Sequence, residues 1–445
     1  MWGVDDSLPR LDNDNAGLQM LLNVYGDTLC AQVTATAMAQ SGHQVNWYVT
    51  APGAWTALEQ GAALYKEQGL RFLLEDQRRS GRLKYRLLEE SRETVDAQVV
   101  FLALHPGNEA LAQDIVSLHG NRPGCELVIN QSMGPVGVSE ALRKVLKEAG
   151  SETELVAMPD ILQEGNAYDN FTRPDNILLG CEDRAAEVLF YELFRPFNRR
   201  RDVIRVMTLR EAEFSKLAIS GILATRISYM NDMAHLSESL GVDINVVRQA
   251  LGADPRIGES YLYPGCGFGG PGLSRNVLTL AEALREKDPE PGLLDQVLRI
   301  NERQKEVLFR KFWRYFSGNV AGKKVAIWGV SFKPGTHRVD NSPALKVIQA
   351  LWAQDVQVAI HDPQGIPELA RWAEGKGTVE VNHDPYVATE NADALMLVTE
   401  WKRYWSPDWA RLKLTMREPL ILDGRNIYDP DFVRGQGLVY EGIGR

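Results

Sequence analysis

Two separate segments of the chain share one pattern: a short apolar run, a glycine, a helical segment and a second apolar run. The first copy covers residues 18–50 and reads LQMLLNVYG, DTLCAQVTATAMAQSG and HQVNWYVT. The second begins with KKVAIWGVSF at residue 323 and continues through SPALKVIQALWAQD and VQVAIHDP. An apolar run of this length indicates a buried strand, and the glycine allows a tight turn into a helix. Because consecutive parallel strands need a helical crossover, each copy predicts a βαβ unit within a parallel sheet.

Further apolar runs enlarge both sheets: AQVVFLAL and CELVINQS in the first half, ADALMLVTEW and PLILDGRN in the second. Between them, residues 210–251 and 293–316 show helical periodicity. We therefore predict an α/β protein with two Rossmann-like, doubly wound domains joined by a central region of long helices. The predicted parts are a flexible leader (1–17), an N-terminal domain (18–205), a central helical region (206–320) and a C-terminal domain (321–445). The long helices are as well suited to a dimer interface as to covering the sheets.

Composition excludes several classes of partner. The net charge of −10 argues against nucleic acid as a partner. Four cysteines, Cys30, Cys125, Cys181 and Cys266, lie far apart without a C-x-x-C pair, which favours a reducing cytoplasm and gives no metal-site spacing. The polar N-terminus is unlike a signal peptide, and no apolar run is long enough to span a membrane. We expect a cytoplasmic protein with no metal and no membrane partner.

The first strand–turn–helix is where a dinucleotide would place its pyrophosphate. Of the pattern G-x-G-x-x-G/A, the chain has Gly26 and Ala31, but Thr28 replaces the middle glycine. Asp27 adds a negative charge to the turn, and the second strand ends at Thr50 without an acidic residue for the ribose. By itself this turn favours a βαβ unit without a dinucleotide.

The segment GFGGPGLSRN, residues 267–276, is predicted to be a loop that holds a small ligand against bare backbone. Four of its ten residues are glycines, and it ends with three polar side chains. Such a loop usually presents a reactive side chain to its ligand. Gly272 stands where that side chain is expected.

Five stretches carry a resemblance to a known family: EAEFSKLAISGILATRISYMNDMA, DPRIGESYLYPGCGFGGPGLSRNV, KKVAIWGVSFKPGTHRVDNSPAL, TEW and DGRNIYDP. In these the chain resembles the UDP-glucose/GDP-mannose 6-dehydrogenase family, over nearly its whole length after the leader. The resemblance implies an N-terminal NAD domain, a helical dimer core and a C-terminal nucleotide-sugar domain. It also implies two successive NAD-dependent oxidations of the sugar C6 alcohol, with a thiohemiacetal on a cysteine between them.

The catalytic positions implied by the resemblance are partly lost. In the family loop GYGGSCFPKD, the serine falls on Pro271, the nucleophilic cysteine on Gly272 and the aspartate on Asn276. The chemistry needs a thiolate, and glycine has no atom to replace it. We interpret Cys266 as a packing residue, and Ser274 as an alcohol without an adjacent base.

Three further catalytic positions follow from other motifs of the family. The lysine of E-A-E-x-x-K is present as Lys216, which would stabilise developing oxyanion charge. The asparagine of S-N-A-F is assigned to Gly221, and the glutamate of N-P-E-F-L-x-E-G falls on Asp160.

The cofactor and substrate positions complete the expected site. In K-P-x-T-x-D-x-R, the arginine that would meet the cofactor pyrophosphate is replaced by an aspartate, with Arg338 nearby. The expected cofactor-binding residues are Gly26, Thr28, Ala31, Ser132, Glu164 and Asp340. The expected substrate-binding residues are Arg256, Tyr261, Leu262, Gly267, Phe268, Gly269, Lys333 and Arg425.

These residues favour a nucleotide-sugar dehydrogenase homologue that has lost the two-step oxidation and still binds a UDP- or GDP-linked sugar. One alternative is an enzyme that still uses NAD, for one oxidation step or on another sugar. Another is a structural or regulatory subunit of an active paralogue. NAD is the expected cofactor of the family, but its binding by this chain is open, as is the choice between a homodimer and a heteromer.

Overall fold

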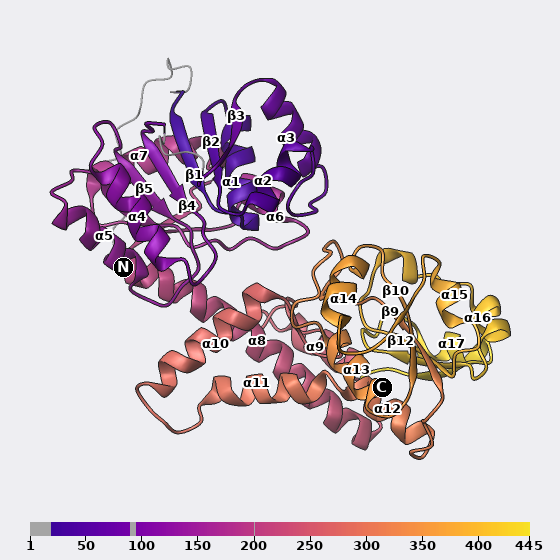
Figure 1. Cartoon of the computed structure of the whole chain (residues 1–445). Coiled ribbons are helices and arrows are strands. Elements are labelled where there is room, and N and C mark those ends of the chain that lie inside the picture. The colour runs from indigo at the N-terminus through magenta and orange to yellow at the C-terminus, as the bar shows by residue number, and fades with distance from the viewer. Residues whose placement is uncertain (1–18, 90–94, 200) are drawn as a thin grey trace.

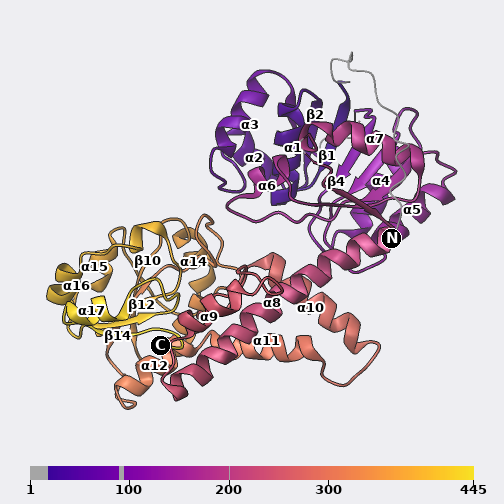
Figure 2. The same cartoon turned by 180° about the vertical axis from the view of Figure 1, so that it is seen from behind.

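The computed structural model describes residues 19–89, 95–199 and 201–445, so the predicted leader lies outside the described residues. Two α/β domains lie at opposite ends of the molecule, and one long helix, α8 (Leu209–Leu240), runs from the first to the second. The view from behind shows that α10 and α11 pack along this helix between the domains (Figures 1 and 2). The predicted fold class is confirmed.

The N-terminal sheet has the order β3-β2-β1-β4-β5-β6-β7-β8 among the described residues. The first six strands pair in parallel in the order of a dinucleotide-type fold, while β7 is antiparallel to β6. These strands read as continuous apolar runs because helices cover both faces. The strands are β1 (Leu21–Tyr25), β2 (Gln44–Val49), β3 (Leu83–Leu87), β4 (Val99–Leu102), β5 (Leu127–Asn130), β6 (Glu154–Ala157), β7 (Ile177–Gly180) and β8 (Ile204–Met207). The helices are α1 (Leu29–Gln40), α2 (Pro52–Glu59), α3 (Leu70–Arg79), α4 (Glu109–Gly120), α5 (Val138–Glu148), α6 (Ala167–Thr172) and α7 (Arg184–Phe194).

The C-terminal sheet repeats this strand order as β11-β10-β9-β12-β13-β14, with every pair parallel. The strands are β9 (Lys324–Trp328), β10 (Gln357–His361), β11 (Glu380–Val381), β12 (Ala394–Leu397), β13 (Leu420–Asp423) and β14 (Val439–Glu441). The helices are α13 (Pro343–Trp352), α14 (Ile366–Ala373), α15 (Pro385–Thr389), α16 (Trp409–Thr415) and α17 (Pro430–Gly435).

The central helices begin and end at residues with clear local causes. A capping box formed by Thr208 and Glu211 starts α8, and Gly241 ends it with a φ of 67°. The predicted helical span to residue 251 is therefore two helices. The remaining central helices are α9 (Ile244–Ala253), α10 (Pro271–Arg285), α11 (Leu293–Gln304) and α12 (Val307–Tyr315).

β8 still pairs with β7 and ends at Met207, and the helical region begins at the Thr208 cap, near the predicted domain boundary at residue 205. The predicted loop 267–276 ends at Gly270, which has a φ of 86° and is followed by Pro271 at the first position of α10. Proline suits that position because its fixed φ is helical and its missing N–H would have no helical partner.

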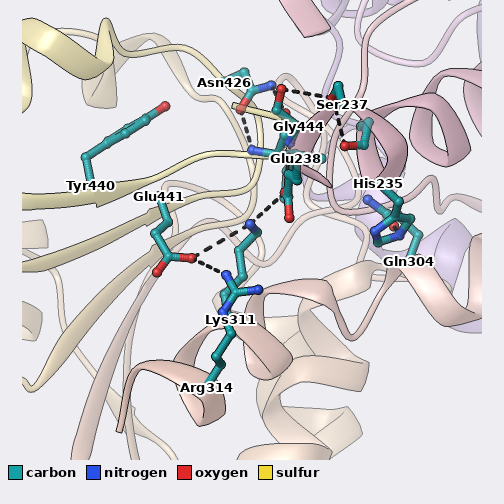
Figure 3. A network of polar contacts seen from close by, with 12 residues as sticks. His235, Ser237, Glu238, Gln304, Lys311, Arg314, Asn426, Tyr440, Glu441 and Gly444 are labelled. Atoms are coloured by element: carbon teal, nitrogen blue, oxygen red, sulfur yellow. Dashed lines mark hydrogen bonds and ion pairs between the residues drawn. The ribbon is translucent and has the colours of Figure 1, made fainter. Parts of the chain in front are cut away.

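The end of the chain joins the C-terminal domain to the far end of α8 (Figure 3). Lys311 of α12 is buried, and its Nζ lies 2.7 Å from Glu238 Oε1 and 3.7 Å from Glu441 Oε2. The Gly444 amide donates to the same Glu238 carboxylate at 2.9 Å, and the Gly444 carbonyl accepts from Ser237 Oγ at 3.1 Å. One lysine thus neutralises two carboxylates from separate parts of the chain.

Replacing Lys311 with methionine should lower the free energy of unfolding by about 3 kcal/mol, because two partly buried carboxylates lose their cation. Arg314→Met is the matched control one turn along the same helix, since Arg314 also pairs with Glu441 but is 64% exposed. The control should cost about 1 kcal/mol or less. Urea unfolding of the full chain measures both, and equal losses would contradict a stabilising role for the buried lysine.

Candidate nucleotide-sugar site

Each sheet has a point where the strand order reverses, and this is where open parallel sheets bind ligands. In the N-terminal sheet it lies between β1 and β4, where a Cβ on Gly26 would stand 2.1 Å from the Ala103 carbonyl oxygen. In the C-terminal sheet it lies between β9 and β12, where a Cβ on Gly329 would stand 2.4 Å from Thr399 Cβ. Both positions require glycine, because any side chain would enter the neighbouring strand.

The polar side chains of the turn after β1 form hydrogen bonds within the protein. Thr28 is the N-cap of α1: its hydroxyl accepts from the Ala31 amide at 3.1 Å and donates to the Ala103 carbonyl at 2.7 Å. The Asp27 carboxylate accepts hydrogen bonds from the Thr50 amide and hydroxyl, and from the next amide. One helix N-terminal amide is thus already occupied, and a carboxylate stands at the end of β2.

The loop after β9 faces this turn and is paired internally in the same way. Arg338 Nε donates to Asp340 Oδ2 at 2.9 Å, and Arg338 Nη1 lies 4.0 Å from Glu164 Oε2. The Thr336 hydroxyl donates to the other oxygen of Glu164. Arg338 is therefore held by two carboxylates. Asp27, in the turn after β1, is also engaged by hydrogen bonds within the protein.

Four of the expected residues lie together in a pocket between the N-terminal domain and α8. Ser132, Asp160, Lys216 and Asn276 line a cavity of about 20 Å³, enough for one water-sized group. Lys216 Nζ donates to the Asp160 carbonyl, and its distance to Asp160 Oδ1 is 3.5 Å. The Lys216 side chain is 15% exposed, so its ammonium group is held at the pocket wall.

Gly221, the residue assigned to the family asparagine, is not among the residues that line this pocket. A Cβ on Gly221 would lie 3.2 Å from Leu280 Cδ2, so this residue is a packing position between α8 and α10. Ser220 is four residues after Lys216 and therefore on the same helical face. Its hydroxyl accepts from Asn276 Nδ2 at 3.0 Å. Ser220 is therefore the residue of α8 that contacts Asn276.

Gly272 lies in the first turn of α10, four residues before Asn276 and on the same helical face. A Cβ built there has no heavy atom within 4 Å. The space for a side chain is therefore open at the position on which the resemblance places the nucleophile. Of the two nearby alternatives, Ser274 Oγ accepts from Asn341 Nδ2, and Cys266 is fully buried. Burial raises the pKa of the Cys266 thiol, which favours the unreactive neutral form.

Side-chain amides of the central helices hold the glycine-rich loop between Gly265 and Gly270 in place. Asn301 Oδ1 accepts from the Phe268 amide at 2.8 Å, and its Nδ2 donates to the Phe268 carbonyl at 3.0 Å. Gln304 Nε2 donates to the Gly265 carbonyl, and Asn231 Oδ1 accepts from the Gly265 amide. These bonds satisfy the buried backbone of a loop that has no regular structure.

The C-terminal domain closes on the same loop. A Cβ on Gly269 would stand 2.6 Å from the Asn341 carbonyl oxygen, so this glycine allows the two backbones to touch. Arg425 Nε donates to the Val398 carbonyl at 2.6 Å, and its Nη1 lies 3.4 Å from the Gly267 carbonyl. The loop and the switch point of the C-terminal sheet thus form one surface.

Two cations lie at this surface. Burial lowers the pKa of Lys333, and the charges of Glu164, Glu67 and Glu400 partly offset the shift. Glu400 also pairs with Arg425 at 3.2 Å. A diphosphate would meet one half-buried lysine and one arginine, each already faced by carboxylates.

The remaining expected substrate residues divide into two groups. Tyr261, with a φ of 60°, and buried Leu262 lead into the glycine-rich loop. Arg256 instead pairs with Asp254 on the surface and its side chain is 86% exposed, so the chain does not bring it to the loop.

Sequence reasoning missed Ser220, Asn301, Gln304, Asn231 and Glu67. The last of these accepts from the Gly165 and Ala167 amides and so shapes the segment that carries Glu164. Four-residue spacing from Lys216 was the one available signal, and it pointed to Ser220. The others show no sequence pattern, because their partners are 33 to 100 residues away.

No helix among the described residues is long and apolar enough to cross a membrane. In the same part of the chain, no three His, Cys, Asp or Glu side chains are grouped so that they could hold a metal ion.

Fold and site together define a two-domain nucleotide-binding protein of the sugar-nucleotide dehydrogenase type. Family models of the UDP-glucose/GDP-mannose dehydrogenases match in three parts: the NAD binding domain over residues 20–198, the central domain over 210–303 and the UDP binding domain over 326–430. The chain belongs to the UDP-glucose/GDP-mannose dehydrogenase family.

Individual relatives agree with this assignment. The chain is 36% identical to a UDP-glucose 6-dehydrogenase of Pseudomonas aeruginosa, with 96% of this chain and 98% of the relative covered. It is 31% identical to one of Rhizobium meliloti, covering 96% and 100%. Among solved structures, a UDP-glucose dehydrogenase from Pyrobaculum islandicum matches with a TM-score of 0.84 at 27% identity, covering 98% and 99%.

Asn301→Ala should weaken UDP-glucose binding at least tenfold and lower the free energy of unfolding, because the buried amide and carbonyl of Phe268 each lose a partner at about 1–3 kcal/mol. Asn121→Ala, at an exposed helix end, is the control. Calorimetric titration and urea unfolding measure the two effects. Wild-type affinity in Asn301→Ala would show that the loop does not depend on this side chain.

Proposed function

We propose that this protein is a nucleotide-sugar-binding member of its family that does not carry out the two-step oxidation of the C6 alcohol. The observation that carries the proposal is the first turn of α10, where Gly272 leaves open space at the nucleophile position. Oxidation past the aldehyde requires a covalent adduct, and loss of such a nucleophile typically costs several orders of magnitude in rate. The described cysteines are all buried and none replaces it.

The cofactor side supports the same proposal. Asp27 and Asp340 place two carboxylates where a pyrophosphate would lie, and Arg338 is engaged by Asp340 and Glu164. The sugar-nucleotide side retains its glycine-rich loop, Lys333 and Arg425. Binding of a UDP- or GDP-linked sugar without tight NAD binding follows from this asymmetry. The four unpaired cysteines fit a cytoplasmic protein.

A second candidate is an enzyme that still oxidises a sugar once. It is favoured by Lys216, which remains beside the pocket with its ammonium group directed to Asp160. A single oxidation to the aldehyde needs a hydride acceptor and a base, but no covalent nucleophile. A purely regulatory subunit is the third candidate, and measurable sugar-nucleotide affinity would exclude it.

Calorimetric titration with NAD, UDP-glucose and GDP-mannose separates the three. We expect one sugar nucleotide to bind with a micromolar Kd and NAD to show no heat of binding. NAD binding of comparable strength would contradict the proposal, and the NADH formed per UDP-glucose would then distinguish one oxidation step from two. Absence of binding by all three ligands would favour the regulatory subunit.

We further propose that two copies associate through α8. Five apolar side chains between a third and two thirds exposed recur along it at intervals of eight, seven, seven and four residues, and so form one stripe: Phe214, Ile222, Tyr229, Leu236 and Leu240. An exposed apolar stripe of this length on a central helix is typical of a subunit interface. A second copy of this chain would present the same stripe.

Light scattering after size exclusion should give about twice the 49.8 kDa chain mass. Ile222→Glu should shift the protein toward the monomer, because a charge would be buried in the interface. Leu414→Glu, on an 84% exposed residue away from α8, is the control. A monomeric wild type would contradict the homodimer and leave association with a paralogue as the use of this stripe.

A further inference from the structure

The two α/β domains touch each other directly, through the segment before α6 and the loop after β9. α6 lies on the side of the N-terminal domain that faces the C-terminal domain in both views (Figures 1 and 2). A Cβ on Gly165 would stand 3.4 Å from the Pro334 carbonyl oxygen, and one on Gly335 would stand 3.4 Å from Gly165 Cα. Backbone therefore lies against backbone where the two domains meet.

Glu164 extends this contact with a carboxylate whose partners belong to the other domain. The Thr336 hydroxyl donates to Glu164 Oε1, and Arg338 Nη1 lies 4.0 Å from Glu164 Oε2. Thr336 is fully buried, and the side chains of Glu164 and Arg338 are 11% and 21% exposed. Burial raises the pKa of Glu164, while Thr336, Arg338 and Lys333 act in the opposite direction and favour the carboxylate. A buried polar group is costly without partners, and here the C-terminal domain supplies them.

The segment that carries Glu164 is anchored within the N-terminal domain. Glu67 accepts from the next amide, that of Gly165, at 2.5 Å. Gln32 of α1 is fully buried; it accepts from the Tyr65 amide at 3.1 Å and donates to the Tyr65 carbonyl at 3.0 Å. Because Tyr65 and Glu67 are two residues apart, these bonds connect the contact to α1.

The loop after β9 is closed by its own hydrogen bonds. The Phe332 amide donates to the Arg338 carbonyl at 3.0 Å, and the Arg338 amide donates to the Thr336 hydroxyl at 3.1 Å. Lys333, one of the two cations of the candidate nucleotide-sugar site, lies inside this loop. An anchor for the loop therefore also positions the lysine.

We propose that Glu164, Thr336 and Arg338 form an interdomain latch, which holds the loop after β9 against the N-terminal domain. The resemblance places Glu164 among the cofactor-binding residues, whereas here the other domain uses its hydrogen-bonding capacity. Glu164 is then a positioning residue that acts on Lys333 through the loop. Opening of the latch would free the two domains to separate while α8 still joins them. The inference goes beyond the proposed function, because the latch consists of protein groups alone.

Hydrogen–deuterium exchange of the full-length protein, resolved to single amides by mass spectrometry, tests the latch without a ligand. Glu164→Ala should speed exchange of the Phe332 amide, in the other domain, about tenfold, because local opening becomes easier when a contact is lost. Thr336→Val should have the reciprocal effect on the Gly165 amide. Effects confined to the mutated domain in both variants would overturn the inference.

Asp340→Asn is the matched control, because Asp340 is the other carboxylate on Arg338 and belongs to the same domain as that arginine. It should leave exchange of the Gly165 amide at the wild-type rate. Glu164→Gln can still accept from Thr336 but has no charge for Arg338, so its effect should be smaller than that of alanine. Faster exchange spread evenly over both domains in Glu164→Ala would also overturn the inference, because it would report global destabilisation.

Discussion

The hydrogen bonds between Asn301 and the backbone of Phe268 are the contacts on which the site depends. They fix an irregular, buried loop against α11, while Gln304 and Asn231 bind Gly265 at the start of the loop. Because this loop leads directly into α10, its position also sets where Gly272 and Asn276 stand relative to Lys216. The C-terminal domain packs onto the other side of the loop. One set of amide contacts thus fixes the loop between the central helices and the C-terminal domain.

The geometry around this loop is that of an intact site, although its chemical groups differ from the family pattern. Gly272, on which the family cysteine falls by the resemblance, lies in the first turn of α10, and the space beside it is open. On the cofactor side, Asp27, Glu164 and Asp340 bind the groups that would otherwise meet a pyrophosphate.

Much of the fold could be predicted from local pattern, and the site only in part. Apolar runs and glycines located eight of the strands in the right order along the chain, since a buried parallel strand is visible in five residues. The motif that carries Lys216 did not show which following residue of α8 would contact Asn276. Only the contact between Asn276 and Ser220 shows which residue of α8 faces the pocket. The break between α8 and α9 was missed because Gly241 interrupts a periodicity that continues on both sides.

The sequence by itself determined the two α/β sheets, the family resemblance and the glycine at position 272, because strands, motifs and residue identities are local properties. Only the tertiary structure decided that Arg338 is already paired and that Ser220 stands beside Asn276. The tertiary structure also decided that Cys266 is fully buried in the core. Each of these findings concerns the partner or the surroundings of a residue. The partner often lies tens of residues away along the chain. Whether a charge is free, paired or buried follows from its neighbours in space, and the order of residues along the chain does not contain that information.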